Sequence, residues 1–425
     1  MFHICVKERL KMINIAVLGY GTVGSGVVEV VETNKKQLNK KTQQELNIKY
    51  ILDLREFPGD PYEDKIVHDV DIIMNDPDVQ IVCETMGGTG AAYKFTKAAL
   101  EAGKSVCTSN KAMVAAHGTE MLEIAKKNNC NYMFEASVGG GIPIIRPLMT
   151  SLCHEYVEEI AGIINGTTNF MLTKMEREGA DYAEVLKEAQ KLGYAEQDPT
   201  ADVEGHDTCR KISILASLML GKTVNFEKVY TEGISKVTAD DFAYAAAAGY
   251  TIKLLGTAKA LEAAYDDEAR AAGKAEVSVK VSSYMVPVNH PIALVNDVMN
   301  GVFVTGNMVG ETMYYGSGAG KLPTASAVVA DIAECAKHVG ENIKVFWDAE
   351  EAKIADYLET ETAFFVRTSA DAADAVFEQF PDAMNIIVDG RNDAAFILPV
   401  MKEKDFVAFA DKLGDKLLGR LRIYA

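Results

Sequence analysis

The stretch AVLGYGTVGSGVV (residues 16–28) joins an apolar run to three closely spaced glycines, Gly19, Gly21 and Gly24. Residues 13–18 predict a buried parallel strand, and a helix is expected after the glycines. In such a turn the first glycine permits the bend, the second lets the backbone approach a pyrophosphate, and the third allows close packing. The pattern favours dinucleotide binding over a purely structural turn, at residues Gly19, Tyr20, Gly21, Thr22, Val23 and Gly24.

Segments of alternating type follow this turn. Strands are expected at 48–53, 79–85, 105–109 and 131–137, and helices at 91–102 and 118–128. Strands that alternate with helices predict a doubly wound parallel sheet. We therefore expect an α/β dinucleotide-binding domain of the Rossmann type at 12–146, with a short return of the chain at about 310–340.

Two further parts are expected. Residues 147–330 have longer strands and helices, which predict an α+β domain for catalysis, substrate binding and dimerisation. Residues 360–425 have the order strand, helix, two strands, helix, strand. That βαββαβ order predicts a small ferredoxin-like module.

Composition excludes several classes of protein. The net charge of −18 over 425 residues argues against binding to nucleic acid or to an anionic membrane. No apolar run approaches the roughly 18 residues that a membrane helix needs. Seven scattered cysteines form no disulfide or zinc pattern, which favours a reducing cytoplasm. Residues 1–11 lack an export signal, and we expect a loose arm or an upstream start there.

The end of the second expected strand bears on the choice of cofactor. Asp53 offers a carboxylate for a ribose hydroxyl, although it lies farther along than the usual roughly 20 residues. Arg55 could equally hold the 2′-phosphate of NADP. These residues leave the choice between NAD and NADP open.

A second group of candidate functional residues lies in EAQKLGYAEQDPTADVEGHDTCRKISILASLML (residues 188–220). Asp207 and Lys211 are four residues apart on an expected helix, so a carboxylate and an ammonium share one face. An ordinary surface ion pair is the alternative. A hydride cofactor, however, needs a proton donor for the carbonyl oxygen, and a lysine held by a carboxylate can serve.

The chain from Met12 to about residue 340 resembles homoserine dehydrogenase. The motifs that carry the resemblance are GYGTVGSGVV, SNKAMVAAHGTE, FEASVGGGIPIIRPL, GIINGTTNFML, LGYAEQDPTADVEGHDTCRK and YGSGAGKLPTASAVVADI. The resemblance implies NAD(P)-dependent interconversion of L-homoserine and L-aspartate 4-semialdehyde, in the biosynthesis of threonine, methionine and isoleucine. It also implies a homodimer or homotetramer.

The resemblance assigns roles to individual residues. It implies that Lys211 carries a proton, that Asp207 is its partner, and that Glu196 holds the substrate ammonium. The other residues implied to bind substrate are Asp202, Gly166 and Thr167, and those implied to lie at the cofactor are Lys111, Gly87 and Gly320. Lys111 is also implied to be catalytic, since it would lie near both the nicotinamide and the substrate. A monovalent cation such as sodium is implied at main-chain oxygens of Glu135, Val138, Gly140 and Ile142.

The chain also departs from the family pattern. Leu52 stands where NADP-preferring members commonly have an arginine, which favours NAD. The C-terminal module is similar to an ACT domain but lacks the usual glycine in TSADAADAVFEQF, so a structural role is as well supported as amino-acid feedback. Another amino-acid aldehyde dehydrogenase and a dinucleotide-sensing regulator are the alternatives, and a regulator would be expected to lose Lys211 or Lys111.

Overall fold

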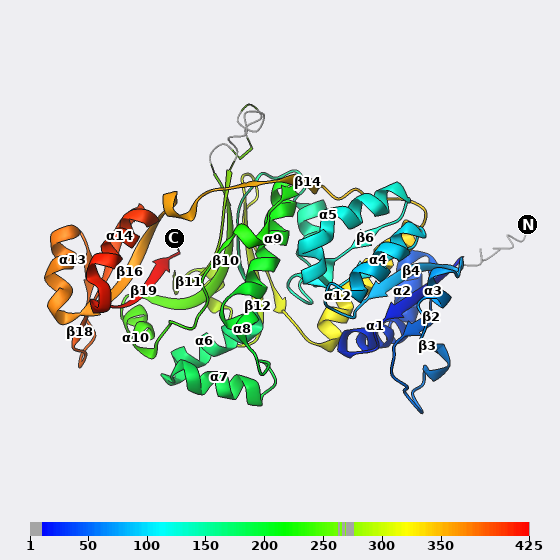
Figure 1. Cartoon of the computed structure of the whole chain (residues 1–425), viewed down its shortest axis with the longest axis horizontal. Coiled ribbons are helices and arrows are strands. Elements are labelled where there is room, and N and C mark those ends of the chain that lie inside the picture. The colour runs from blue at the N-terminus through cyan, green and yellow to red at the C-terminus, as the bar shows by residue number, and fades with distance from the viewer. Residues whose placement is uncertain (1–10, 262–263, 266–267, 269–275, 425) are drawn as a thin grey trace, which may run out of the picture. The chain divides into compact units, whose positions relative to one another are not determined.

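The computed structural model describes residues 11–261, 264–265, 268 and 276–424 (Figure 1). The chain forms two compact units: Met1–Arg146 with Ala319–Ala349, and Pro147–Gly318 with Glu350–Ala425. Almost all of the expected N-terminal arm, residues 1–11, lies outside the described residues. No helix in the described ranges has the length and apolar character needed to cross a membrane.

The first unit is a doubly wound parallel sheet with strand order β3-β2-β1-β4-β5-β6, which confirms the predicted fold. Its strands are β1 Lys11–Leu18, β2 Gln44–Leu52, β3 Ile66–Val67, β4 Val79–Glu84, β5 Ser105–Thr108 and β6 Tyr132–Met133. Its helices are α1 Thr22–Thr33, α2 Lys35–Thr42, α3 Asp71–Met74, α4 Ala91–Glu101, α5 Lys111–Lys127 and α12 Lys321–Lys337.

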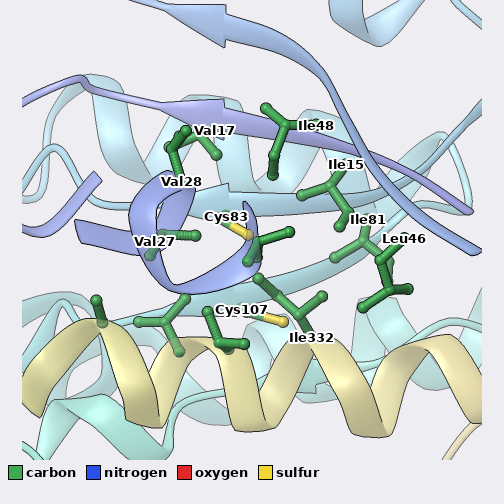
Figure 2. Packing of buried hydrophobic residues seen from close by; sticks show 14 of the residues in the cluster. Ile15, Val17, Val27, Val28, Leu46, Ile48, Ile81, Cys83, Cys107 and Ile332 are labelled. Carbon is green, nitrogen blue, oxygen red and sulfur yellow. The ribbon is translucent and has the colours of Figure 1, made fainter. Parts of the chain in front are cut away.

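Helix α12 completes the core of this unit although it follows α5 by nearly two hundred residues. Figure 2 shows Val27 and Val28 of α1 packed between the strands and α12, where Ile332 points into the same cluster. Gly26 lets the two helices meet, because a Cβ there would lie 2.8 Å from the carbonyl oxygen of Lys321. The apolar face of α12 thus covers sheet surface that would otherwise be exposed.

The strand predicted at 131–137 is wrong in length. Only Tyr132 and Met133 pair with β5, and Glu135–Ser137 forms a single 3₁₀ turn. The carboxylate of Glu135 accepts hydrogen bonds from three consecutive backbone N–H groups, those of Ile144, Ile145 and Arg146. These long-range bonds turn the chain away from the sheet, and a period-two pattern cannot reveal them.

The helix predicted at 118–128 begins seven residues earlier, at Lys111. Gly118 lies inside α5 and is required there by packing. A Cβ on Gly118 would lie 2.9 Å from the Trp347 ring, so the glycine admits the indole. Asn110 caps the true start by accepting a hydrogen bond from the N–H of Met113 at 3.2 Å.

The second unit is built on a mixed sheet whose main path is β13-β12-β7-β10-β11-β19-β16-β18-β17. Its first strands are β7 Val157–Ile163, β10 Tyr250–Ala260, β11 Glu276–Pro287, β12 Met299–Gly306 and β13 Gly310–Ser317. The helices that accompany them are α6 Gly166–Glu178, α7 Tyr182–Lys191, α8 Thr200–Val203, α9 His206–Leu220 and α10 Ala239–Ala247. The predicted α+β class is confirmed.

The C-terminal elements have the predicted βαββαβ order: β16 Glu361–Ser369, α13 Ala373–Gln379, β17 Met384–Ile386, β18 Asp393–Lys402, α14 Glu403–Leu413 and β19 Leu417–Ile423. Strand β19 pairs with β16 on one side and, over Arg422 and Ile423, with β11 on the other. The buried Arg422 guanidinium lies 2.6 Å from Glu403 and 3.1 Å from Glu232. The module therefore continues the sheet of the second unit.

We predict that Gly24→Ala lowers the stability of the first unit. A Cβ on Gly24 would lie 1.8 Å from the carbonyl oxygen of Gly19, so α1 must shift, which costs about 1–3 kcal/mol of unfolding free energy. Gly21→Ala is the matched control, because no atom lies within 4 Å of its Cβ position. Thermal unfolding measures both, and equal melting temperatures for the two variants would contradict the packing argument.

Candidate active site

The glycine turn of the first unit leaves backbone accessible at the start of α1. Gly19 has φ +92°, a conformation that favours glycine, and its N–H donates to the carbonyl oxygen of Leu52 at 2.8 Å. Gly21 precedes the first helical residue, Thr22, and the space beside its Cα is open. A helix start of this kind presents N–H groups and a positive dipole end to a phosphate.

A cavity of 670 Å³ adjoins this turn. Its lining includes Gly19, Gly21 and the end of β2, together with apolar side chains. Arg55 and His68 supply basic groups to the same lining, and Asp53 supplies an acid. Apolar walls with a few polar groups are what a nucleotide half of a dinucleotide requires.

The Asp53 carboxylate in this cavity accepts several hydrogen bonds. It accepts the N–H of Tyr20 at 2.8 Å and is held by the Arg55 guanidinium at 2.9 Å. The Arg55 hydrogen bonds hold the pKa of the Asp53 carboxyl well below its usual range, so it stays ionised. Asp53 and Arg55, which left the choice between NAD and NADP open in the sequence, are therefore paired with each other.

Lys111 begins α5 and is positioned by a buried network that sequence analysis missed. The fully buried carboxylate of Glu84, at the end of β4, accepts from the Thr108 hydroxyl at 2.7 Å. That hydroxyl accepts the N–H of Asn110 at 2.9 Å, and the Asn110 amide donates to the carbonyl oxygen of Gly88. Glu84 also accepts the N–H of Gly87 at 3.2 Å, so one carboxylate links the Gly87 loop to the start of α5.

The segment 135–142 contains the main-chain oxygens that the resemblance implicates in cation binding. Its residues are almost all buried, with Gly139 and Gly140 at positive φ. Burial raises the pKa of the Glu135 carboxyl, an effect that its three N–H donors oppose. Among the described residues, no backbone hydrogen bond outside the helices and strands ends on the carbonyl oxygens of Val138, Gly140 and Ile142.

The second unit holds the predicted acid and lysine of α9. The Lys211 ammonium lies 2.7 Å from Oδ2 of Asp207 and donates to the carbonyl oxygen of Ile164 at 2.7 Å. Lys211 is 9% exposed and Asp207 3% exposed, which excludes the ordinary surface ion pair. A buried ammonium held by two oxygens is suited to proton transfer with a bound substrate.

Asn165 links these groups, and sequence analysis did not single it out. Its side-chain amide donates to Asp202 at 2.7 Å and to Asp207 at 2.9 Å. Its side-chain oxygen accepts the N–H of Thr168 at 2.9 Å and caps α6. Asn165 thus bridges the Asp202 and Asp207 carboxylates and also fixes the start of α6. Its position in the sequence, directly before Gly166 and Thr167, is the feature that could have indicated this role.

The remaining predicted substrate residues surround the start of α6. Gly166 is its first residue, and a Cβ there would lie 2.9 Å from the carbonyl oxygen of Val298. The Thr167 hydroxyl donates to the carbonyl oxygen of Tyr194 at 2.6 Å, two residues before Glu196. Glu196 is exposed, and the Gln190 amide donates to its carbonyl oxygen at 3.1 Å.

Comparisons with known proteins agree on one family. A family model described as homoserine dehydrogenase matches residues 143–333, and one described as its NAD binding domain matches residues 19–135. A homoserine dehydrogenase of Neisseria gonorrhoeae is 43% identical over 341 residues, 78% of this chain and 74% of that protein.

Solved structures give the same result. A homoserine dehydrogenase from Thiobacillus denitrificans is 34% identical with a TM-score of 0.86, covering 98% of this chain and 99% of that one. A hyperthermophilic archaeal homoserine dehydrogenase in complex with NADPH is 26% identical with a TM-score of 0.63, covering 76% and 97%.

We predict that Asn165→Ala reduces turnover at least tenfold, because Asp202 and Asp207 lose a shared donor. Asn225→Ala is the matched control, since Asn225 also caps a helical turn by accepting the N–H of Glu227. Loss of either cap costs about 1 kcal/mol of unfolding free energy. Steady-state rates beside melting temperatures distinguish the effects, and equal turnover of the two variants would show that Asn165 is only a cap.

Proposed function

Because this chain belongs to the homoserine dehydrogenase family, we propose that Lys211 carries the proton in its reaction. The chain is an NAD(P)-dependent oxidoreductase that interconverts L-homoserine and L-aspartate 4-semialdehyde in amino-acid biosynthesis. The observation that carries the proposal is the buried Lys211 ammonium, held between Asp207 and the Ile164 carbonyl oxygen.

The chemistry needs one proton carrier at the C4 oxygen of the substrate. When bound, NAD(P) supplies or accepts the hydride at C4. In the reductive direction the Lys211 ammonium donates a proton to the aldehyde oxygen, and in the oxidative direction the neutral amine accepts the hydroxyl proton. Asp207 holds the ammonium 2.7 Å away and stabilises its charged form, so it acts as the partner of Lys211.

The amino-acid end of the substrate needs partners for an ammonium and a carboxylate. We assign the ammonium to Glu196 and Asp202, because both acids lie in the segment between α7 and α9. Gly166 and Thr167 at the start of α6 offer backbone N–H groups to the carboxylate. The Thr167 hydrogen bond to Tyr194 supports this assignment, since it ties α6 to the segment that contains Glu196.

For the cofactor we propose binding at the glycine turn, from Gly19 to Gly24, and at Gly87, Lys111 and Gly320. Gly320 precedes α12 with φ +117°, where other residues would be strained. Lys111 is fixed at the start of α5 by the Glu84 network, which supports a role beside the nicotinamide. We propose a modest preference for NAD, because Arg55 is engaged by the Asp53 carboxylate and is therefore less available to a 2′-phosphate.

We also propose a monovalent cation such as sodium at the carbonyl oxygens of Glu135, Val138, Gly140 and Ile142. Buried carbonyl oxygens usually accept hydrogen bonds, and in the described residues no backbone hydrogen bond outside the helices and strands ends on those of Val138, Gly140 and Ile142. Neutral oxygen ligands suit a hard cation of low charge. Its role is structural: it would hold the buried 135–142 segment in one conformation.

The oligomer that we propose is a dimer or tetramer of this chain. Strand β13 ends the main path of the sheet, and none of its residues is fully buried. Met308 and Val309, in the turn before it, are 79% and 48% exposed, and Tyr315 is 57% exposed. An edge strand with exposed apolar neighbours supports pairing with a second copy. We also propose a cytoplasmic location, because the seven cysteines are scattered along the sequence without a disulfide pattern.

We predict that Lys211→Ala lowers kcat by about 10²- to 10⁴-fold, the usual contribution of a general acid or base. Dinucleotide affinity, measured by NADPH fluorescence titration, should stay close to that of the unmodified chain. Lys228→Ala removes the same charge from a side chain that is 60% exposed and serves as the control. A Lys211→Ala variant that keeps more than a tenth of kcat would rule out Lys211 as the proton carrier.

We predict that both cofactors support activity, with NADH giving the higher kcat/KM for reduction of aspartate semialdehyde. Asp53→Ser should move the ratio toward NADPH by about tenfold, which corresponds to roughly 1.4 kcal/mol. Asp60→Asn is the control, because Asp60 interacts with the Tyr20 hydroxyl but does not line the cavity. A tenfold NADPH preference in the unmodified chain, or an unchanged ratio in Asp53→Ser, would refute this proposal.

A further inference from the structure

Asp331 lies in the middle of α12, on the buried face of the helix. It is 2% exposed, and its carboxylate has two partners from the segment 135–146. Oδ2 accepts the N–H of Glu135 at 2.9 Å, and Oδ1 lies 2.5 Å from the Arg146 guanidinium. A single helical side chain therefore holds both ends of a twelve-residue stretch.

The Glu135 side chain also holds the segment 135–146 together. Its carboxylate accepts the N–H groups of Ile144, Ile145 and Arg146 at 2.7, 2.9 and 2.7 Å. Glu135 is 3% exposed, so these bonds stand in place of hydrogen bonds to water. Two buried carboxylates, on Glu135 and Asp331, close the segment into a loop whose ends cannot separate without leaving buried polar groups unpaired.

Helix α12 also restrains the middle of this loop. A Cβ on Gly141 would lie 2.9 Å from Cβ of Pro323, in the first turn of α12, so the loop backbone packs directly against the helix. The four carbonyl oxygens of the proposed cation site lie between the restrained ends. Glu135 takes part in both arrangements. Its N–H donates to Asp331, and its carbonyl oxygen is one of the four proposed cation ligands.

We propose that Asp331 is a positioning residue that sets the affinity of the 135–142 loop for a monovalent cation. The inference rests on the cation site proposed above. Main-chain ligands cannot be replaced by substitution, so the spacing of the four oxygens depends on what fixes the loop. Asp331 fixes it from outside the ligand set, through the Glu135 N–H and the Arg146 guanidinium. Loss of such an outer partner typically weakens metal affinity about 10- to 100-fold.

The test is thermal unfolding of the full chain during titration with sodium chloride, with tetramethylammonium chloride holding the ionic strength constant. The unmodified chain should gain melting temperature with sodium until the site saturates. Asp331→Asn keeps an acceptor for the Glu135 N–H but loses the carboxylate oxygen that contacts the Arg146 guanidinium. Its sodium midpoint should rise at least tenfold.

Glu334→Gln is the matched control on the same helix, because Glu334 pairs with the exposed Lys337 and should leave the midpoint unchanged. A merely structural role for Asp331 lowers the melting temperature at every salt concentration with the midpoint unmoved, and that outcome overturns the proposal. If Asp331→Asn does not fold, Arg146→Lys is the second variant, since it keeps the charge but loses the planar guanidinium. An unmoved midpoint there overturns the proposal too.

The outcomes also separate this inference from the cation site itself. An unmodified chain whose melting temperature ignores sodium refutes both the site and the inference. A sodium response in the unmodified chain with the same midpoint in Asp331→Asn keeps the site and refutes only the role of Asp331. Neither result bears on Lys211, which lies in the other unit.

Discussion

The buried ammonium of Lys211 is the constraint around which α9, the start of α6 and the end of β7 are organised. A charge removed from water needs partners close by, and here they come from separate elements. Asp207 is one turn earlier on α9, and the Ile164 carbonyl oxygen lies just after β7. The Asn165 amide then holds Asp207 from the start of α6. The ion pair itself lies within α9, and the end of β7 and the start of α6 must be in place before its remaining hydrogen bonds form.

The first unit satisfies its buried charges in the same way. Glu84 and Glu135 accept backbone N–H groups from loops that lie at the carboxyl end of the sheet or beyond it. Each acid holds a loop that would otherwise have several conformations. The chain thus uses carboxylates at strand ends and in the following loop to determine the geometry of segments that contain little regular structure.

Most of the fold could be predicted from the sequence, because local spacing encodes it. The glycine turn, the alternating segments and the βαββαβ order each depend on residues close together in the chain. The resemblance supplied the roles of Lys211 and Asp207. Glu84, Asn165 and Asp331 could not be predicted from spacing, because their partners come from other elements. The 131–137 strand failed for the same reason, since Glu135 pairs with residues about ten positions later.

The place of α12 in the first unit has a consequence for how the chain is made. Residues 147–318 leave the ribosome between the last strand of the parallel sheet and the helix that covers it. During that interval the surface that Ile332 and its neighbours later bury stays exposed to water. Native contacts that span so much sequence form slowly, and exposed apolar surface favours aggregation while they do. The nascent chain should therefore depend most on chaperones after the sheet has emerged and before residue 337 has left the ribosome.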